Sequence, residues 1–274
     1  MSRMDSYVCI TGATGGLGRA FAVECAERGW DLVLTDLSAE ALANLATALS
    51  VAYEVNVRSY PCDLTDNASR EAMFEAFRQS NLTFWSLINV AGIDYEGPFK
   101  DRTLGQIRKV IRLNIEATLE VTRTILDLRD ETKVFRLINV SSLASFYPMP
   151  VKAIYAASKR FLLDFSLALR EELRPWGGTV TTLCPAGMPT TAEVINRINA
   201  QGLMGRITTK NVGFVVARTL DHALKGHSVY IPGLVNRLLR LLGGLIPPTL
   251  VAHLIGHRWR STHQRALKSL CLPG

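Results

Sequence analysis

The stretch ITGATGGLG, Ile10 to Gly18, holds four glycines in its last seven residues. It follows a short apolar run and precedes a segment with the periodicity of a helix. Glycine lets a backbone turn tightly and approach a pyrophosphate, which then binds the amides at the N-terminus of the next helix. The spacing Gly12-x-x-x-Gly16-x-Gly18 differs from the commoner G-x-G-x-x-G, and a plain tight turn is the alternative interpretation. Its position between a first strand and a first helix favours a phosphate-binding loop.

Short apolar runs alternate with helical patterns outward from this loop. The expected strands are Tyr7–Ile10, Asp31–Thr35, Val55–Pro61, Ser86–Asn89, Val134–Val140, Val180–Leu183 and Val229–Ile231. The expected helices are Leu17–Arg28, Ala39–Leu49, Ala68–Gln79, Leu104–Leu128 and Ala153–Leu173, the last stopped by Pro175 and Gly177-Gly178. This alternation predicts a doubly wound parallel α/β sheet with helices on both faces. We expect one domain over residues 1–274, with 232–274 as a basic helical C-terminal extension.

Length and composition fit that fold. The 274 residues are 48% hydrophobic, enough to bury the core of one α/β domain. No uncharged apolar run reaches the roughly 18 residues that a transmembrane helix needs, and the N-terminus lacks a secretory core and cleavage site. The five cysteines show no paired spacing, which is typical of buried thiols in a reducing compartment. We therefore expect a cytoplasmic protein without disulfides or a metal site.

Asp36 ends the second expected strand, about twenty residues beyond the glycine loop. A carboxylate there can accept hydrogen bonds from an adenosine ribose and repels a 2′-phosphate. Neither Gly15 nor Leu37 offers a cation to such a phosphate, and Arg19 is expected to face solvent. A turn or capping role before Ser38 is the alternative interpretation. The charge argument favours NAD as cofactor, with NADH preferred over NADPH.

A second cluster of polar residues lies far along the chain, in INVSSLASFYPMPVKAIYAASKRF. Tyr155 and Lys159 are four residues apart on an expected helix, so they share one face. A phenol with a pKa near 10 is a poor acid–base group at neutral pH, and a neighbouring ammonium lowers that pKa. Ser142 closes the preceding strand, where its hydroxyl can bond a substrate carbonyl. A Tyr-x-x-x-Lys pair is common on helices and does not by itself indicate a catalytic site.

Taken together, these motifs resemble the short-chain dehydrogenase/reductase superfamily, in its single-domain, Rossmann-type branch. The resemblance runs from about Tyr7 to Ile231, and the serine–tyrosine interval of thirteen residues matches the family's usual spacing. Its motifs are Thr11–Gly18, Asp36, Cys62-Asp63-Leu64, Asn89–Gly92, Asn114, Ser142, Tyr155-x-x-x-Lys159 and Cys184–Thr191. One such motif is weak, whereas eight in the family's order are specific.

The resemblance implies a role for each matched residue. Tyr155 would exchange the proton, Ser142 would polarise the carbonyl or hold the alcohol, and Lys159 would bind the nicotinamide ribose and depress the tyrosine pKa. Asn114 would hold a water that extends the proton relay. Asp63 would meet the adenine. The expected cofactor contacts are Thr11, Gly12, Thr14, Gly15, Gly16, Leu17, Gly18, Asp36, Leu37, Asp63, Leu64, Asn89, Ala91, Gly92, Tyr155, Lys159, Pro185, Gly187 and Thr190.

The chain departs from the family pattern at two places. Val90 replaces the usual second asparagine of the Asn89–Gly92 motif, which loses one possible hydrogen bond. The usual proline-glycine pair is Pro185-Ala186, with the glycine moved to Gly187. Thr190 keeps the family's distance from the proline and is the expected carboxamide contact, with Thr191 as a close alternative. Neither departure touches the four expected catalytic residues.

The net charge of +7 belongs to the C-terminal part of the chain. No acidic residue follows Asp221, and the whole excess is carried by Lys225, Arg237, Arg240, Arg258, Arg260, Arg265 and Lys268. In the expected helix Leu234–Leu242, four leucines line one face (Leu234, Leu238, Leu241 and Leu242), opposite two of these arginines. We expect that face to pack on the substrate side of the cleft or on a neighbouring subunit. Peripheral contact with an anionic membrane is the alternative, and nucleic-acid binding is not expected.

The substrate segments are apolar. Thr190–Ile207 mixes isoleucine, leucine and methionine with few charges, and Phe146–Pro150 adds aromatic and proline side chains beside Ser142. The expected reaction is NAD-dependent interconversion of a bulky apolar secondary alcohol and ketone, with a hydroxysteroid as the favoured class. A 3-oxoacyl (fatty-acyl) reductase is the rival enzyme. A non-catalytic dinucleotide sensor or a membrane-surface scaffold is the alternative of another class. The family resemblance also implies a homodimer or homotetramer.

Overall fold

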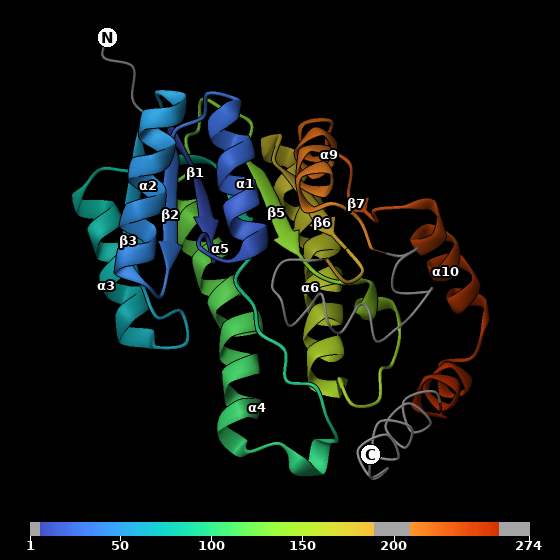
Figure 1. Cartoon of the computed structure of the whole chain (residues 1–274). Coiled ribbons are helices and arrows are strands. Elements are labelled where there is room, and N and C mark those ends of the chain that lie inside the picture. Colours follow the sequence, from blue (N-terminus) through green and yellow to red (C-terminus); the bar gives the residue numbers. More distant parts are fainter. Residues whose placement is uncertain (1–5, 189–208, 258–274) are drawn as a thin grey trace, which may run out of the picture.

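A computed structural model of the chain describes residues 6–188 and 209–257. Its centre is a seven-stranded sheet in the order β3-β2-β1-β4-β5-β6-β7, in which every neighbouring pair runs parallel (Figure 1). The strands are β1 (Ser6–Thr11), β2 (Leu32–Asp36), β3 (Val57–Pro61), β4 (Thr83–Asn89), β5 (Arg136–Val140), β6 (Thr179–Leu183) and β7 (Val229–Tyr230). The strand order reverses between β1 and β4, and such a switch point is where doubly wound folds bind ligands. The predicted fold class is confirmed.

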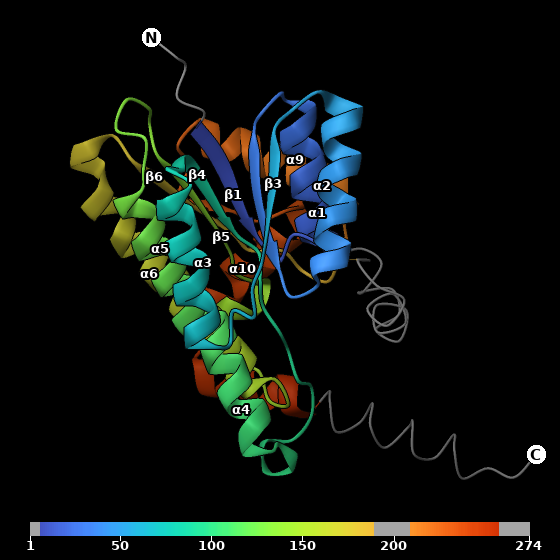
Figure 2. The same cartoon turned by 90° about the vertical axis from the view of Figure 1, so that its left-hand side faces the viewer.

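Helices cover both faces of the sheet, which Figure 2 shows between two helical layers. The helices are α1 (Gly16–Glu27), α2 (Ala39–Tyr53), α3 (Asn67–Gln79), α4 (Leu104–Ile111), α5 (Ala117–Asp127), α6 (Ala153–Leu173), α9 (Val212–Leu224) and α10 (Leu234–Leu245). Short 3-10 turns occur at η1 (Phe99–Asp101), η3 (Leu143–Phe146) and η4 (Arg174–Trp176). Helices α1, α2 and α9 form one layer, and α3, α5 and α6 form the other.

The pleat of β1 shows how the two layers obtain their cores. Val8 and Ile10 pack with the apolar residues of α1, α2 and α9, whereas Tyr7 and Cys9 pack with those of α3, α5 and α6. Successive residues of a strand point to opposite faces, so a strand covered on both sides must be apolar throughout. All six residues of β1 are accordingly buried.

Helix ends follow the local chemistry of the sequence. The Ser38 hydroxyl accepts a hydrogen bond from the backbone amide of Ala41 at 3.2 Å, which caps α2. Helix α6 spans Ala153–Leu173, as predicted, and gives way to η4 and then to Gly177 with a φ of 72°. That left-handed conformation favours glycine and ends the helix.

The expected single helix over Leu104–Leu128 is interrupted. Between α4 and α5 the backbone forms one π-helical turn, η2 (Arg112–Glu116), so the chain stays helical but the turn is wider than an α-helical one. Asn114 lies in this turn and is fully buried. Periodicity cannot reveal such a turn, because apolar residues on either side keep a helical spacing.

The C-terminal part differs from expectation in its orientation. Helix α10 runs to Leu245 through the Gly243-Gly244 pair, and residues 248–257 form a further helical segment. The predicted packing of the leucine face on the cleft is wrong, since Leu234, Leu238, Leu241 and Leu242 are all exposed in the single chain, whereas packing on a neighbouring subunit stays a prediction. Asn236 is the buried residue of this helix instead. The leucines therefore point away from the body of the protein.

The described cysteines are free thiols. Cys9, Cys25, Cys62 and Cys184 are all buried and unpaired, as expected. Among the described helices, none is long and apolar enough to cross a membrane.

Candidate active site

One large cavity opens at the carboxyl ends of the strands, with a volume of about 830 Å³. Its walls come from the β1–α1 loop, the ends of β2, β4, β5 and β6, and one face of α6. It brings together sixteen of the predicted site residues: Gly12, Gly15, Gly16, Leu17, Gly18, Asp36, Leu37, Asp63, Leu64, Ala91, Gly92, Ser142, Tyr155, Lys159, Pro185 and Gly187. Segments far apart in the sequence thus form a single site at the switch point of the sheet.

The glycine loop is shaped by close backbone contacts. Gly12 has a φ of 66°, which side chains rarely adopt, and a Cβ there would lie 2.9 Å from the backbone of Ala91. A Cβ on Gly18 would lie only 1.9 Å from the carbonyl oxygen of Gly12. Gly15 caps α1 without any side-chain hydrogen bond, so the first amides of that helix remain available to an anion. The positions of Gly12 and Gly18 therefore require glycine.

Asp36 is tied to this loop. One carboxylate oxygen accepts hydrogen bonds from the backbone amide of Thr14 at 2.9 Å and from its hydroxyl at 2.7 Å. The other oxygen accepts the backbone amide of Leu37 at 2.7 Å. A carboxylate offers about four acceptor positions, so room remains for a ribose hydroxyl. Thr14 itself does not line the cavity; it positions Asp36 instead.

The expected catalytic residues meet on the opposite wall. Tyr155 and Ser142 line the same part of the cavity. Lys159 is buried and lies one helical turn further along α6, with its ammonium 5.8 Å from the centre of the Tyr155 ring. That ammonium donates to the carbonyl oxygen of Val140 at 2.8 Å, at the end of β5. The predicted grouping of serine, tyrosine and lysine on one cavity wall is what the structure shows.

Burial decides the acid–base properties of these groups. It raises the pKa of Tyr155 above its ordinary value, and the nearby Ser142 hydroxyl and the positive charge of Lys152 oppose that rise. Burial also lowers the pKa of Lys159 to about 8. In the protein by itself, desolvation therefore outweighs the groups that favour the ionised tyrosine.

Asn114 lies behind the cavity wall. Its side-chain amide donates to the carbonyl oxygen of Ile93 at 3.0 Å and to the Ser158 hydroxyl at 3.1 Å, and its oxygen accepts the Ile93 amide at 2.8 Å. A Cβ on Gly92 would meet its amide oxygen at 3.3 Å and the Lys159 ammonium at 3.2 Å. Asn114 thus joins the end of β4 to the helix that carries Lys159.

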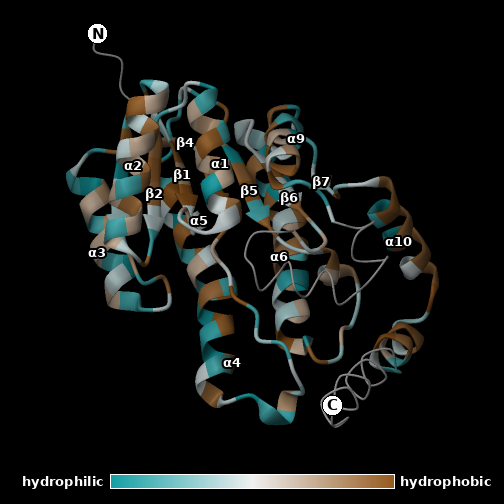
Figure 3. Ribbon diagram, viewed as in Figure 1, coloured by the Kyte–Doolittle hydropathy of each residue, from teal (hydrophilic) through white to brown (hydrophobic). Residues whose placement is uncertain are grey.

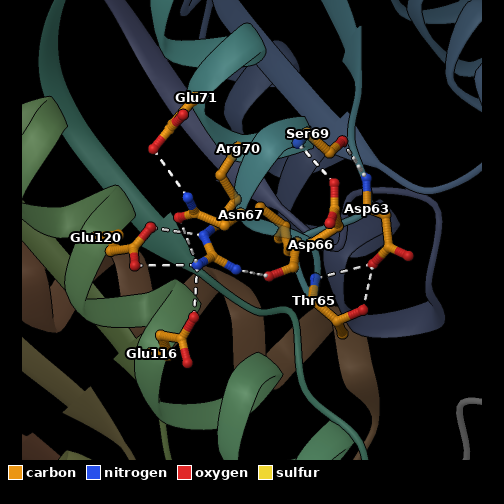
Figure 4. Close-up of polar contacts among 10 residues, drawn as sticks. Asp63, Thr65, Asp66, Asn67, Ser69, Arg70, Glu71, Glu116 and Glu120 are labelled. Carbon is orange, nitrogen blue, oxygen red and sulfur yellow. Dashed lines mark hydrogen bonds and ion pairs between the residues drawn. The ribbon is translucent and has the colours of Figure 1, made fainter.

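A buried arginine holds the π-helical turn in place (Figure 4). The Arg70 side chain is fully inaccessible, and its guanidinium donates to Glu116 and Glu120, each at 2.6 Å. It also donates to the carbonyl oxygen of Leu64 at 2.8 Å. Glu116 ends the turn that contains Asn114, so Arg70 connects α3 to the turn and to a residue of the cavity wall.

Three predicted contacts have structural partners instead. The Asn89 amide donates to Thr122 at 3.0 Å and to Asn139 at 2.9 Å, inside the protein. The Thr11 hydroxyl accepts the backbone amides of Val90 and Ala91 at 3.1 and 3.2 Å, which holds the end of β4 without a second asparagine. With Thr14, these side chains do not line the cavity. Thr190 and Thr191 lie outside the described residues.

Asp63 lines the same cavity as the glycine loop. Its carboxylate accepts the backbone amide of Thr65 at 2.8 Å and the Thr65 hydroxyl at 2.7 Å (Figure 4). These hydrogen bonds hold the pKa of Asp63 below its ordinary value. The side chain is therefore an ionised acceptor, suited to an amino group such as that of adenine.

One charged residue of the cavity wall, Lys152, is not among the site residues predicted from the sequence. Lys152 lies on the cavity wall and binds two carboxylates, Asp94 at 2.5 Å and Glu96 at 3.1 Å. Its ammonium lies 5.8 Å from the centre of the Tyr155 ring. A helical offset of three residues from Tyr155 is the signal that could have placed Lys152 on the same face.

The cavity residues fit a dinucleotide. The glycine loop is a tight turn that side chains at Gly12 and Gly18 would prevent, the first amides of α1 suit a pyrophosphate, and Asp36 suits a ribose. A volume of about 830 Å³ is in the range of cofactor sites. Ser142, Tyr155 and Lys159 lie on the opposite wall of the same cavity.

Comparison with known proteins agrees with this geometry. Residues 6–200 match the family described as short chain dehydrogenase. Sulfoacetaldehyde reductase 2 of Chromohalobacter salexigens is 34% identical over 196 residues, which cover 71% of this chain and 77% of that protein. A short-chain dehydrogenase from Sphingobium yanoikuyae, solved in complex with NADPH, superimposes with a TM-score of 0.72 at 30% identity, over 87% of this chain and 93% of that one.

A second solved structure is the bulky-bulky ketone specific alcohol dehydrogenase from Comamonas testosteroni. It superimposes with a TM-score of 0.73 at 26% identity and covers 89% of this chain and 94% of its own. The family match spans most of the described strands and the whole of the tyrosine–lysine helix. The protein therefore belongs to the short-chain dehydrogenase family and is an oxidoreductase that acts on alcohols or ketones.

Proposed function

We propose that the protein interconverts a bulky apolar secondary alcohol and the corresponding ketone with NAD as cofactor. The observation that carries the proposal is the cavity in which Ser142, Tyr155 and Lys159 face the glycine loop and Asp36. A bound nicotinamide dinucleotide supplies or accepts the hydride. The protein contributes position, a proton donor and a water-poor environment.

The proton chemistry belongs to Tyr155. Its raised pKa keeps the phenol protonated at neutral pH, which suits a proton donor to the oxygen of a ketone undergoing reduction. Ser142, which lines the cavity with Tyr155, donates to the same substrate oxygen. Lys159 binds the nicotinamide ribose and restores the tyrosine proton, for which a pKa of about 8 is well matched. Asn114 continues the relay toward solvent through a water.

Asp36 supports the preference for NAD. The groups bonded to its carboxylate are the hydroxyl and amide of Thr14 and the amide of Leu37, none of which is a cation. A 2′-phosphate there would meet a negative charge without a neutralising partner. Side-by-side titrations that found NADPH bound more tightly than NADH would contradict this preference.

The cavity lining supports a bulky apolar substrate. Leu143, Tyr147, Met149 and Met188 line the cavity close in sequence to Ser142 or to the β6 loop. The similarity to a dehydrogenase described as specific for bulky-bulky ketones points the same way. We propose a hydroxysteroid as the substrate class, because a rigid polycyclic ketone fills such a cavity without much loss of conformational entropy.

The decisive experiment is Tyr155→Phe, which keeps the ring and removes the hydroxyl. Turnover of a ketone substrate should fall at least about a hundredfold, because proton donation is lost, while NADH binding changes little. The control is Tyr60→Phe, whose hydroxyl bonds Ser80 outside the cavity. A Tyr155→Phe protein that keeps the wild-type rate would disprove the mechanism.

A substrate screen separates the enzyme classes. Oxidation of reduced nicotinamide is followed for steroid ketones and for 3-oxoacyl thioesters under the same conditions. Faster reduction of the acyl substrates would favour a 3-oxoacyl reductase, and inactivity on every ketone despite tight NADH binding would favour a dinucleotide sensor.

The four buried free thiols support a cytoplasmic location. A homodimer or homotetramer stays a prediction, which sedimentation velocity measures.

A further inference from the structure

The C-terminal helices expose many leucine side chains. Helix α10 exposes Leu234, Leu238, Leu241, Leu242 and Leu245, and the segment 248–257 adds Leu250 and Leu254; we name these seven residues the leucine face. Leu234 and Leu245 are 81% and 82% exposed, at opposite ends of α10. Figure 3 shows α10 as a largely hydrophobic ribbon at the edge of the molecule. Exposed apolar patches of this kind mark binding surfaces.

The other side of α10 fixes this orientation. The Asn236 amide is buried and donates to the carbonyl oxygen of Pro232 at 2.7 Å. Arg237 donates to the carbonyl oxygen of Ile231 at 3.0 Å, and the Arg240 guanidinium lies 5.2 Å from the centre of the Phe146 ring. The polar face of α10 therefore contacts the rest of the protein, and these contacts turn the leucines outward.

Glycines allow a close approach on the same inner side. A Cβ on Gly243 would lie 2.1 Å from the Tyr147 ring, and one on Gly256 would lie 3.4 Å from Pro150. Tyr147 belongs to the loop after Ser142 and lines the cavity. The C-terminal helices thus rest on the cavity wall, and rotating α10 to bury its leucines would break every one of these contacts.

The segment that carries the leucine face is cationic in sequence. From His222 to the end of the chain it contains seven lysines and arginines and no acidic residue. In the described part these are Lys225, Arg237 and Arg240, all exposed, with Arg237 and Arg240 on the side of α10 that contacts Ile231 and Phe146. A cationic segment with an exposed apolar stripe is complementary to an anionic lipid surface, which offers acyl chains and phosphate groups together.

A second copy of the chain is the other possible occupant. In a two-fold contact through the leucine face, each residue meets the corresponding region of its partner. The positive charges around one leucine face would then lie against those of the other, with no acidic residue in either segment to offset them. Like charges placed together disfavour that contact, whereas they favour an anionic membrane.

We propose that the leucine face is a membrane-docking surface that binds the anionic face of a lipid bilayer. The leucines enter the boundary between headgroups and acyl chains, and the positive charge of the segment attracts the anionic headgroups. The helices lie on the membrane without crossing it. This binding does not depend on the reaction catalysed, although it would bring the Tyr147 wall of the cavity next to the source of an apolar substrate.

Sedimentation with vesicles tests the proposal on the full chain. One set of vesicles is phosphatidylcholine, and the other is equal parts phosphatidylcholine and phosphatidylglycerol. The protein should sediment with the anionic vesicles only, and added salt should weaken the binding. Leu245→Ser and the double variant L234S/L245S should lower the partition coefficient, the double variant at least about tenfold. The matched control is Val51→Ser on α2, which removes a side chain that is 77% exposed.

The leucine variants should keep the wild-type melting temperature and ketone turnover, because the two replaced side chains contact mainly solvent in the structure. Absence of wild-type binding to anionic vesicles overturns the proposal, as does an equal loss of binding in Val51→Ser. A change from a larger to a smaller species in sedimentation velocity, caused by L234S/L245S without any vesicle binding of the wild type, would assign the face to a second copy. The proposed reaction stands or falls separately, with Tyr155→Phe.

Discussion

At the scale of single residues, the proton donor Tyr155 lies near an ion pair between Lys152 and Asp94, and both of these charges act on its pKa. Lys152 opposes the rise in the pKa of Tyr155, whereas Asp94 adds to it. Lys152 and Asp94 are themselves bonded at 2.5 Å. A pair so close to the proton donor can set the pH at which the tyrosine changes form.

This arrangement predicts opposite pH shifts for two substitutions. Alcohol oxidation needs the ionised tyrosine as base, so its rate rises as the pH approaches the pKa of Tyr155. Lys152→Met removes a charge that lowers this pKa and should move the rising limb of kcat/KM to higher pH. Asp94→Asn removes a charge that raises the pKa and should move the limb to lower pH. Lys133→Met, at an ion pair away from the cavity, is the control. Shifts in the same direction would show that the pair acts only through structure.

Several site residues could be predicted because their chemistry is local or their spacing is fixed by a helix. Tyr155 and Lys159 share a face of α6 in any α-helix, and Ser142 follows directly from the end of β5. Asp94 and Glu96 could not be predicted, since they meet Lys152 only through the way a loop folds back on α6. The backbone bond from the Gly97 amide to the Val151 carbonyl, at 2.8 Å, shows that approach.

At the scale of elements, the sharpest constraint is the turn between β1 and α1. The sequence identified its glycines, and the structure gives the reason for each: Gly12 needs its positive φ, and Gly18 needs the missing Cβ. The π-helical turn and the outward leucines of α10 could not be predicted. Both depend on partners distant in sequence, Arg70 for the turn and Tyr147 for the helix.

Gly18→Ala should disrupt the loop. The new Cβ would lie 1.9 Å from the Gly12 carbonyl oxygen, so the backbone must shift. We expect a loss of about 2 kcal/mol in the free energy of unfolding, measured by chemical denaturation. We also expect a large fall in NADH affinity, measured by titration. Gly244→Ala is the matched control, because no atom lies within 4 Å of its Cβ position and alanine favours a helix. Unchanged NADH binding in Gly18→Ala would contradict a phosphate site in this loop.

Arg70→Met tests the anchor of the π-helical turn. The substitution removes two ion pairs from a fully buried guanidinium and leaves the Leu64 carbonyl without its donor. We expect the free energy of unfolding to fall by about 3 kcal/mol. This is toward the lower end for broken buried ion pairs, because both glutamates are partly exposed and can be hydrated. Differential scanning calorimetry gives the measurement. Arg78→Met, at an exposed pair with Glu75 on the same helix, should change stability by less than about 1 kcal/mol.

At the scale of the whole molecule, the cavity joins both halves of the sheet. Its walls include the glycine loop and Asp36 on one side and α6 with the β6 loop on the other. A ligand that contacts both sides stabilises the folded chain as a unit, since it binds the native state and not the unfolded one. The composition predicted this single fold, because the apolar residues suffice for one core, but it could not predict the size of the cavity.

NADH should therefore raise the melting temperature of the entire domain. At a concentration of about one hundred times the dissociation constant, the stabilisation is about 2.7 kcal/mol. NADPH at the same concentration should raise the melting temperature less, because Asp36 repels the 2′-phosphate. Asp36→Ala should narrow the difference between the two nucleotides. Equal shifts for both nucleotides with the wild-type chain would remove the basis for NAD preference.

The buried cysteines can serve as probes of local unfolding. Burial raises the pKa of the Cys9 and Cys184 thiols to about 12, so in the closed protein they are protonated and enclosed. Neither can react with iodoacetamide until its surroundings separate, and the two lie in different strands or strand ends, β1 and β6. With Cys271 replaced by serine, the order in which brief pulses of reagent mark these two sites would give a time course of local unfolding, read peptide by peptide in a mass spectrometer without any added dye.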